Sequence, residues 1–245
     1  MADPYYSMVA TLMHFDAMLT PTRIYDSAPV PAQTIMPTSG VKISTAQKKF
    51  GDSSCLFDGG YIWLGNVADP QFIPGAGQDF CIESQCYDVG GGNRRILFGN
   101  SESGGVGGTL SILLPTSNTF SVGVTIGGTQ YLIQPATPAP LNTWYHLALV
   151  RYGTTLTLYL NGTSIGSTTV PTGAVSTPTG RFSIGSAGLY LGYGGSYGVQ
   201  WMGYIDEFRF TIGNARYTGN LTPPESAFDP NDPTPPPGLF FVRSR

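Results

Sequence analysis

The stretch NTWYHLALVRYGTTLTLYLNGTSIGS, residues 142–167, decides the fold class of this chain. Its runs 144–151 and 156–160 are rich in aromatic, β-branched and leucine residues and are bounded by Gly, Asn or Thr. Such short, partly alternating runs are typical of half-buried antiparallel strands. The pair Asn161-Gly162 follows the second run and supplies the positive φ angles of a two-residue type I′ turn. The stretch therefore predicts neighbouring antiparallel strands joined by a tight hairpin.

Similar short runs recur along the rest of the chain. The expected strands are 9–16, 80–87, 95–100, 110–114, 120–126, 130–134 and 204–212. With 33 Gly, 20 Pro and only 11% charged residues, the chain has little material for long amphipathic helices. We therefore predict an all-β fold, a two-sheet antiparallel jelly-roll β-sandwich. All-β sandwiches commonly reach this length as one unit, so residues 1–222 are expected to form a single domain.

Two proline-rich segments interrupt this pattern. Residues 25–48 are predicted to be a long surface excursion within the domain, because their prolines oppose regular strand pairing. Residues 223–245 are predicted to be an extended C-terminal tail, since seven prolines fall between positions 223 and 237. An apolar cluster ends this tail: Leu239, Phe240, Phe241 and Val242. These residues either fold back onto the sandwich or form a docking peptide that inserts into a neighbouring subunit.

Charge and cysteine usage exclude several classes of protein. The net charge is −3 and Lys and Arg form no run, which argues against a nucleic-acid partner or a membrane partner. The first residues show no basic segment followed by an apolar one, so we expect no signal peptide and synthesis in a host cytoplasm. The three cysteines, Cys55, Cys81 and Cys86, are an odd number and argue against a disulfide scaffold. Buried thiols are expected, with an intermolecular disulfide as the alternative.

The order of these motifs resembles a known family. The hairpin, the run RFSIGS (181–186) and the closing string GYIDEFRFTIGNARYTGNLTPP (203–224) are similar to the laminin-G-like branch of the concanavalin A-like lectin/glucanase superfamily. The run KKFGDSSCLFDGGYIWLG (48–65) resembles the family's entry strand and its FDG-x-Y turn, and the likeness covers roughly residues 13–228. One departure is clear, because Ser84 and Gln85 stand where relatives have Phe-Trp. The resemblance implies a jelly roll.

The sequence argues against an enzyme. Glucanases of this superfamily use carboxylates that share one face of a strand. Here the adjacent acidic pair Asp206-Glu207 is expected to point to opposite faces, and Glu83 is isolated. His14 and His146 have no Ser or Cys nucleophile at motif spacing. A carbohydrate-active enzyme or its carbohydrate-binding module remains the alternative function.

The resemblance also implies one structural calcium ion on the convex side of the sandwich. Asp206 would provide its carboxylate, and further oxygens would come from near Asp16 and from Asp58 and Gly59. Calcium takes six to eight hard oxygen ligands, so carbonyls with one or two carboxylates suffice. The alternative is that Asp206 only forms hydrogen bonds with nearby backbone.

Aromatic residues are the candidate ligand contacts. Tyr193 and Tyr197 lie among glycines in the loop 188–204, and Tyr61 and Trp63 alternate after the turn at 58–60. Exposed aromatic faces stack well on sugar rings or on protein partners. By the resemblance, Trp201 and Tyr204 occupy core positions.

Laminin-G-like domains of this kind occur in bacteriophage virion and tail proteins, and the closing string ARYTGNLTPP (215–224) is especially similar to them. The resemblance implies a non-enzymatic structural and adhesion protein located in the virion, as a capsid decoration protein or a tail or fibre component. Expected partners are other virion proteins, reached through extended termini, and a cell-surface glycan. We expect a homo-oligomer or membership of a larger assembly.

Overall fold

The computed structural model describes residues 4–16, 24–32, 35–91, 95–100, 109–186 and 200–228. In these residues the chain forms two antiparallel sheets, and helical structure is limited to the 3-10 turns η1 (Tyr6–Met8) and η2 (Pro70–Phe72). No helix in this part of the chain is long and apolar enough to span a bilayer. The predicted all-β, two-sheet antiparallel sandwich is confirmed.

The first sheet has eight strands in the order β13-β12-β11-β6-β15-β4-β3, with β1 paired to β15. Its strands are β1 (Val9–Met13), β3 (Val41–Ser44), β4 (Ser54–Asp58), β6 (Phe80–Asp88), β11 (Trp144–Tyr152), β12 (Thr155–Leu160), β13 (Thr163–Thr169) and β15 (Met202–Ile212). The second sheet has seven strands in the order β10-β9-β8-β7-β14-β5-β2. Its strands are β2 (Ile35–Pro37), β5 (Ile62–Leu64), β7 (Arg95–Gly99), β8 (Leu110–Leu114), β9 (Ser121–Ile126), β10 (Thr129–Ile133) and β14 (Phe182–Ile184).

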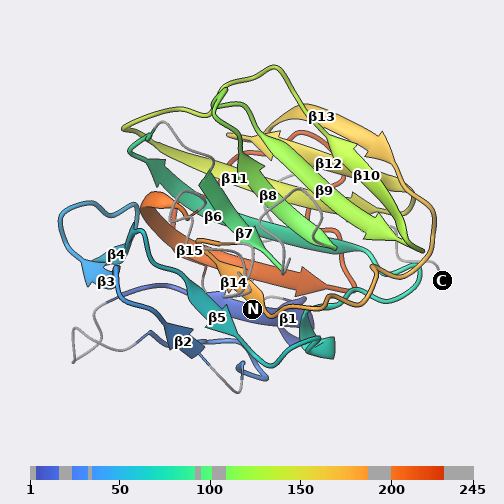
Figure 1. Ribbon diagram of the computed structural model, residues 1–245, viewed down its shortest axis with the longest axis horizontal. Helices are drawn as coiled ribbons and strands as arrows, with labels where there is room; N and C mark the ends of the chain where they lie inside the picture. The colour runs from blue at the N-terminus through green and yellow to red at the C-terminus, as the bar shows by residue number, and fades with distance from the viewer. Residues whose placement is uncertain are drawn as a thin grey trace.

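The main core lies between the two sheets. Figure 1 shows them stacked as layers, with β8, β9 and β10 lying over β11 and β12. Because side chains alternate along a strand, Tyr145, Leu147 and Leu149 of β11 enter the core and meet residues such as Val122 and Val124 of β9. The intervening residues of β11 point to the outer face of the eight-stranded sheet, the face turned away from the second sheet.

The hairpin predicted at Asn161-Gly162 is confirmed. It joins β12 to β13, which pair antiparallel, and the two turn residues have φ angles of 46° and 81°. Both values are positive, as a type I′ turn requires.

The proline-rich excursion at 25–48 is more ordered than predicted. It contains β2 and β3, which pair with β5 and β4 at the edges of the two sheets. Pro37 ends β2, an edge strand, where its missing N–H does not interrupt a central ladder. The prolines therefore restrict these strands to the sheet edges rather than preventing pairing.

The outer face of the eight-stranded sheet is partly covered by residues 213–228, here called the closing segment. Ala215 and Tyr217 pack with Cys81 and Val150 in a second apolar cluster, and Phe228 is buried against β1. The tail that was predicted to leave the sandwich at residue 223 thus remains packed on it through Phe228. Burial of this aromatic ring holds the segment against the sheet, and the prolines that precede it can stay extended.

All three cysteines are buried free thiols. Cys86 lies in the main core and Cys81 under the closing segment, so the two point to opposite faces of β6, as predicted. Burial raises the pKa of Cys86 to about 12, which keeps this thiol protonated and unreactive at neutral pH.

Candidate functional site

A bulge in β15 separates the two neighbouring carboxylates of the closing strand. Asp206 lies opposite Gln85 and Arg209 lies opposite Glu83, so three steps on β15 match two steps on β6. The extra residue is accommodated by Glu207, whose φ is 53°. The bulge directs Asp206 and Glu207 to different partners.

Asp206 is fully buried beside the loop that precedes β4. Its Oδ2 accepts hydrogen bonds from the amides of Lys49 at 2.8 Å and Phe50 at 3.0 Å, whereas its Oδ1 has no partner. Burial raises the pKa of Asp206 to about 7, since the two amides offset it only in part, and the negative charges of Glu207 and Asp16 raise it further. An unpaired buried carboxylate oxygen with a second carboxylate nearby is an arrangement that a cation would stabilise.

The other residues predicted to hold calcium are divided between two places. Asp16 accepts a hydrogen bond from the amide of Asp52 at 2.9 Å, in the same loop region as Asp206. Asp58 lies opposite Met202, four residues from Asp206 along β15. Four residues of a strand span about 13 Å, whereas a calcium ion binds its oxygens at about 2.3–2.6 Å. One ion at Asp206 therefore cannot also be bound by Asp58 and the adjacent Gly59, which corrects that part of the predicted ligand set.

Glu207 forms a separate polar contact on the other side of the bulge. Its carboxylate contacts Nδ1 of His14 at 2.9 Å and accepts the amide of Phe228 at 2.8 Å. Burial lowers the pKa of His14, but the hydrogen bond and the charge of Glu207 outweigh this effect and hold the pKa above 6.5. The contact joins β1, β15 and the end of the closing segment.

Because the folded state raises the pKa of His14, this contact should stabilise the protein fully below pH 6.5 and less as pH rises through the folded pKa. His14→Gln should therefore lower the melting temperature at pH 5.5 by more than at pH 8.5. The difference should correspond to less than about 1 kcal/mol, because His14 is partly exposed. Thermal unfolding of both proteins at the two pH values measures it, and an equal loss at both would contradict it.

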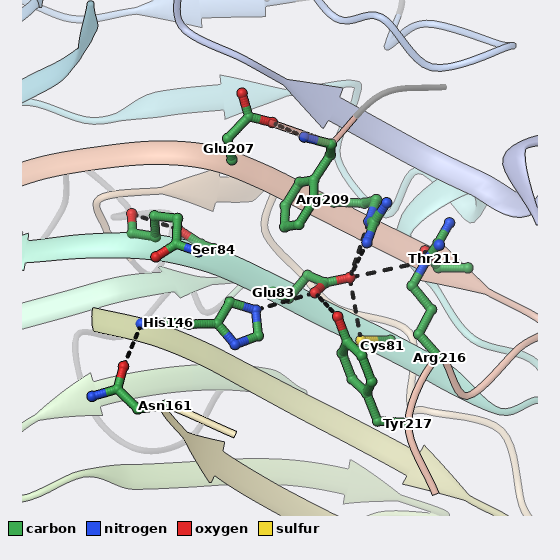
Figure 2. Close-up of polar contacts among 12 residues, drawn as sticks. Cys81, Glu83, Ser84, His146, Asn161, Glu207, Arg209, Thr211, Arg216 and Tyr217 are labelled. Atoms are coloured by element: carbon green, nitrogen blue, oxygen red, sulfur yellow. Dashed lines mark hydrogen bonds and ion pairs between the residues drawn. The ribbon is translucent and has the colours of Figure 1, made fainter. Parts of the chain in front are cut away.

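Glu83, which looked isolated in the sequence, is the centre of a buried polar network (Figure 2). Its Oε1 accepts from Nε and Nη2 of Arg209 at 3.0 and 2.7 Å. Its Oε2 accepts from the hydroxyl of Tyr217 at 2.6 Å and contacts Nε2 of His146 at 3.2 Å. The network thus joins β6, β11 and β15 to the closing segment.

Burial alone would raise the pKa of Glu83. The charge of Arg209, the hydrogen bond from His146 and the charge of Arg216 outweigh it and hold that pKa well below its ordinary range. A carboxylate in this state is a poor proton donor, because its lowered pKa keeps it ionised at neutral pH. Its position under the closing segment also separates it from solvent.

The aromatic residues predicted as ligand contacts are only partly described. Tyr61 and Trp63 lie on the outer face of the seven-stranded sheet, both half-buried, with ring centroids 5.1 Å apart. The guanidinium of Arg181 lies 5.4 Å from the centre of the Trp63 ring. The other predicted contact residues lie outside the described residues: Tyr193, Tyr197, Leu239, Phe240, Phe241 and Val242.

Three aromatic residues that were not predicted as contacts form a line across the outer face of the eight-stranded sheet. Trp144 of β11, Tyr87 of β6 and Tyr204 of β15, here called the aromatic row, lie opposite one another and are all half-buried. Tyr204 was expected in the core and is instead on this face, while Trp201 is fully buried as expected. Within its own strand, none of the three differs from other outward-facing residues. Only the pairing registers of β11, β6 and β15 show that the three lie side by side.

Comparison with known proteins identifies the fold more closely. A family model for the concanavalin A-like lectin/glucanases superfamily matches residues 75–212. No curated protein matches the sequence. Domain 4 of AbnA, a GH43 extracellular arabinanase from Geobacillus stearothermophilus, solved in complex with arabinotriose, is 16% identical, with a TM-score of 0.50 over 84% of this chain and 93% of that one.

Two toxin structures are also similar. A structure of botulinum neurotoxin type C, which depends on interaction with two ganglioside molecules to enter cells, is 10% identical, with a TM-score of 0.57 over 86% of this chain and 49% of that one. The binding domain of botulinum neurotoxin DC, in complex with SialylT, is 10% identical, with a TM-score of 0.54 over 92% and 50% of the two chains. This chain spans about half the length of these toxin chains. At such identities the likeness is one of fold alone.

Proposed function

This chain belongs to the concanavalin A-like lectin/glucanase superfamily, and on that premise we propose that it is a non-enzymatic, glycan-binding structural and adhesion protein of a bacteriophage virion. The lectin-like sandwich supports the glycan-binding part of the proposal. The similar structures include an arabinanase domain bound to arabinotriose and toxin domains that interact with gangliosides or SialylT. Because fold alone does not fix function, the remaining support comes from the chain's own side chains.

The observation that carries the non-enzymatic part is the engagement of Glu83 and Glu207, two carboxylates on the central strands β6 and β15. Glycoside hydrolysis uses two carboxyl groups that flank the scissile bond, one of them as a proton donor. Glu83 is ionised and bound by Arg209, His146 and Tyr217, and Glu207 is bound by His14 and by the amide of Phe228. Neither group can approach a sugar without breaking the contacts that hold the closing segment.

A panel of soluble polysaccharides tests binding and catalysis together. Affinity gel electrophoresis should show retardation of the protein in gels that contain at least one of arabinan, xylan, hydroxyethylcellulose or laminarin. Incubation with the same polymers should release no new reducing ends. Release of reducing ends by the natural protein would instead support the alternative, a carbohydrate-active enzyme.

The virion part of the proposal rests on the likeness of residues 215–224 to phage structural proteins and on the apolar end of the tail. Fully burying one large apolar side chain contributes about 1.5–3 kcal/mol, so the four residues 239–242 are well suited to docking on an adjacent subunit. Deleting residues 238–245 should leave the melting temperature nearly unchanged and abolish incorporation into particles. Mass spectrometry of purified particles, with separated capsids and tails, measures incorporation and location. A truncated protein that unfolds readily but still assembles would contradict the docking role.

We also propose one structural calcium ion at Asp206. The unpartnered buried Oδ1 of Asp206 and the nearby carboxylate of Asp16 fit such an ion, and backbone oxygens would complete its shell of six to eight ligands. Bound there, calcium would neutralise two carboxylates and tie the loop before β4 to the bulge of β15.

Calcium at 100 times its dissociation constant should add about 2.7 kcal/mol to the free energy of unfolding. Thermal unfolding with calcium or with a chelator should therefore give different melting temperatures for the natural protein. Asp206→Asn should remove the difference, whereas Asp58→Asn, at the far end of the same strand pair, should retain it. A melting temperature that chelation does not change would leave Asp206 with its hydrogen bonds to Lys49 and Phe50 alone.

A further inference from the structure

We propose that the aromatic row, Trp144, Tyr87 and Tyr204, is the surface on which this chain binds a glycan, and that Gln85 and His146 beside it bind sugar hydroxyls. The inference rests on the proposed glycan-binding function and assigns it to the outer face of the eight-stranded sheet. It differs from the contacts predicted from the sequence, which were Tyr61, Trp63, Tyr193 and Tyr197.

The row is set by the sheet itself. Trp144 lies opposite Tyr87, and Tyr87 lies opposite Tyr204, so one aromatic residue comes from each of three adjacent strands. The ring centroids are 5.5 Å apart for Tyr87 and Trp144 and 5.8 Å apart for Tyr87 and Tyr204, with edge-to-face geometry in both pairs. Strand positions hold such rings more rigidly than loops do, and rigid aromatic surfaces lose little entropy on binding.

The row continues toward the sheet edge. Tyr204 lies opposite Leu56 of β4, which is half-buried, and Leu56 lies opposite Lys42 of β3, which is exposed. A line of apolar surface therefore crosses four strands and ends beside an ammonium group that can donate hydrogen bonds. The closing segment packs farther along the same strands, over the positions of Cys81 and Glu83. An extended ligand could thus lie along the row without displacing it.

Cross-strand aromatic pairs also stabilise sheets, so the rings alone would not indicate a ligand. The second observation is a pair of unpartnered polar atoms next to them. Gln85 lies two residues from Tyr87, His146 lies two residues from Trp144, and the two face each other across β6 and β11. Each residue is 1% exposed, yet Nε2 of Gln85 and Nδ1 of His146 have no hydrogen-bond partner. Buried polar groups are nearly always paired, and leaving them unpaired is costly.

The chemistry of this pair matches a hydroxyl group. Nε2 of His146 donates to the carboxylate of Glu83, which leaves Nδ1 for a hydroxyl group: Nδ1 accepts a hydrogen bond in the neutral ring and donates one in the charged ring. Nε2 of Gln85 is a donor. A hydroxyl both donates and accepts, and a sugar combines such groups with an apolar face that stacks on aromatic rings. Because both atoms are buried, a sugar hydroxyl reaches them only when neighbouring side chains move aside.

Four variants test the row against the same polysaccharide panel. Trp144→Ala and Tyr204→Ala should each weaken binding of the retained polymer by about tenfold or more, as the loss of a central aromatic contact does. Tyr152→Ala is the matched control, because Tyr152 is on the same face of β11 at its other end and is 57% exposed. It should change affinity less than twofold. Gln85→Met should weaken binding without lowering the melting temperature, since it removes a donor that has no partner in the free protein.

The outcomes separate this inference from the proposed function. If the natural protein binds a polymer and the row variants bind it equally well, the row is not the site although glycan binding stands. If the natural protein binds none of the polymers, both ideas fail. If Trp144→Ala changes the oligomeric state in size-exclusion chromatography but not the affinity, the face belongs to a second copy of the chain. Should Trp144→Ala unfold, Trp144→Leu keeps apolar volume and tests the ring alone.

Discussion

Replacing Glu83 with glutamine is expected to lower the free energy of unfolding by about 3–5 kcal/mol, the usual cost of removing one partner from a buried ion pair. The substitution removes the buried carboxylate charge that faces Arg209 and Arg216 and weakens the hydrogen bond from Tyr217. For a chain of this length the loss corresponds to a fall in melting temperature of about 6–20 °C. Calorimetry or denaturant unfolding measures it.

Two controls make the result specific. Glu225→Gln removes an exposed carboxylate from the closing segment and should change stability by less than about 0.5 kcal/mol. The double variant Glu83→Gln with Arg209→Met should lose less than the sum of the single losses, because each single substitution already removes the ion pair between the two residues. Additive losses would show that the two residues do not stabilise one another.

Because of the same network, the free energy of unfolding should depend on pH in the acidic range. The folded state lowers the pKa of Glu83, so its contribution is present above the ordinary value of 4.5 and is lost as pH falls below it. The natural protein should therefore lose stability between pH 5 and pH 3 more steeply than the Glu83→Gln variant. Parallel slopes in the two proteins would contradict this origin.

The second large effect is expected at the hairpin. Gly162 has a φ of 81°, and a Cβ added there would overlap the carbonyl oxygen of Leu221 in the closing segment. Its own carbonyl accepts the amide of Leu221 at 2.9 Å. Gly162→Ala would hold a residue with a Cβ in the left-handed region, which costs about 1–2 kcal/mol. The added Cβ would also clash with Leu221 and push the hairpin away from the closing segment. We expect a total loss of about 3 kcal/mol in the free energy of unfolding.

The variant Gly153→Ala separates the backbone strain from the clash with Leu221. Gly153 has a φ of 59°, but its added Cβ would meet nothing within 4 Å. This variant should show the conformational strain alone, about 1–2 kcal/mol. Equal losses in the two variants would show that contact with Leu221 adds nothing to the effect.

The strands were predictable because each is specified by its own residues. The run at 110–114 matches β8, and the runs at 80–87 and 204–212 differ from β6 and β15 by one or two residues. The alternation that placed Cys81 and Cys86 on opposite faces follows from the two-residue repeat of a strand. What local pattern could not show was that the proline-rich residues 35–44 pair at sheet edges, since an edge strand needs only one neighbour.

The candidate site was less predictable because distant segments form it. Glu83 meets His146 and Tyr217, 63 and 134 residues away in the chain, so nothing near Glu83 distinguishes it from an isolated acid. The aromatic row has the same origin, since Tyr87, Trp144 and Tyr204 meet only through the register of three strands. The bulge at Glu207 separates Asp206 from its neighbour by a backbone feature that side-chain identity does not predict.

The central place of β15 has a consequence for how the protein is made. This strand lies between β6 on one side and β4 and β1 on the other, yet it leaves the ribosome after all three. At about 5–20 residues per second, the roughly 110 residues between β6 and β15 take about 6–20 s to synthesise. During that time the strands that await β15 have unpaired edges, which favour aggregation. We therefore expect the eight-stranded sheet to close only after β15 has emerged, and the nascent chain to be most prone to aggregation before then.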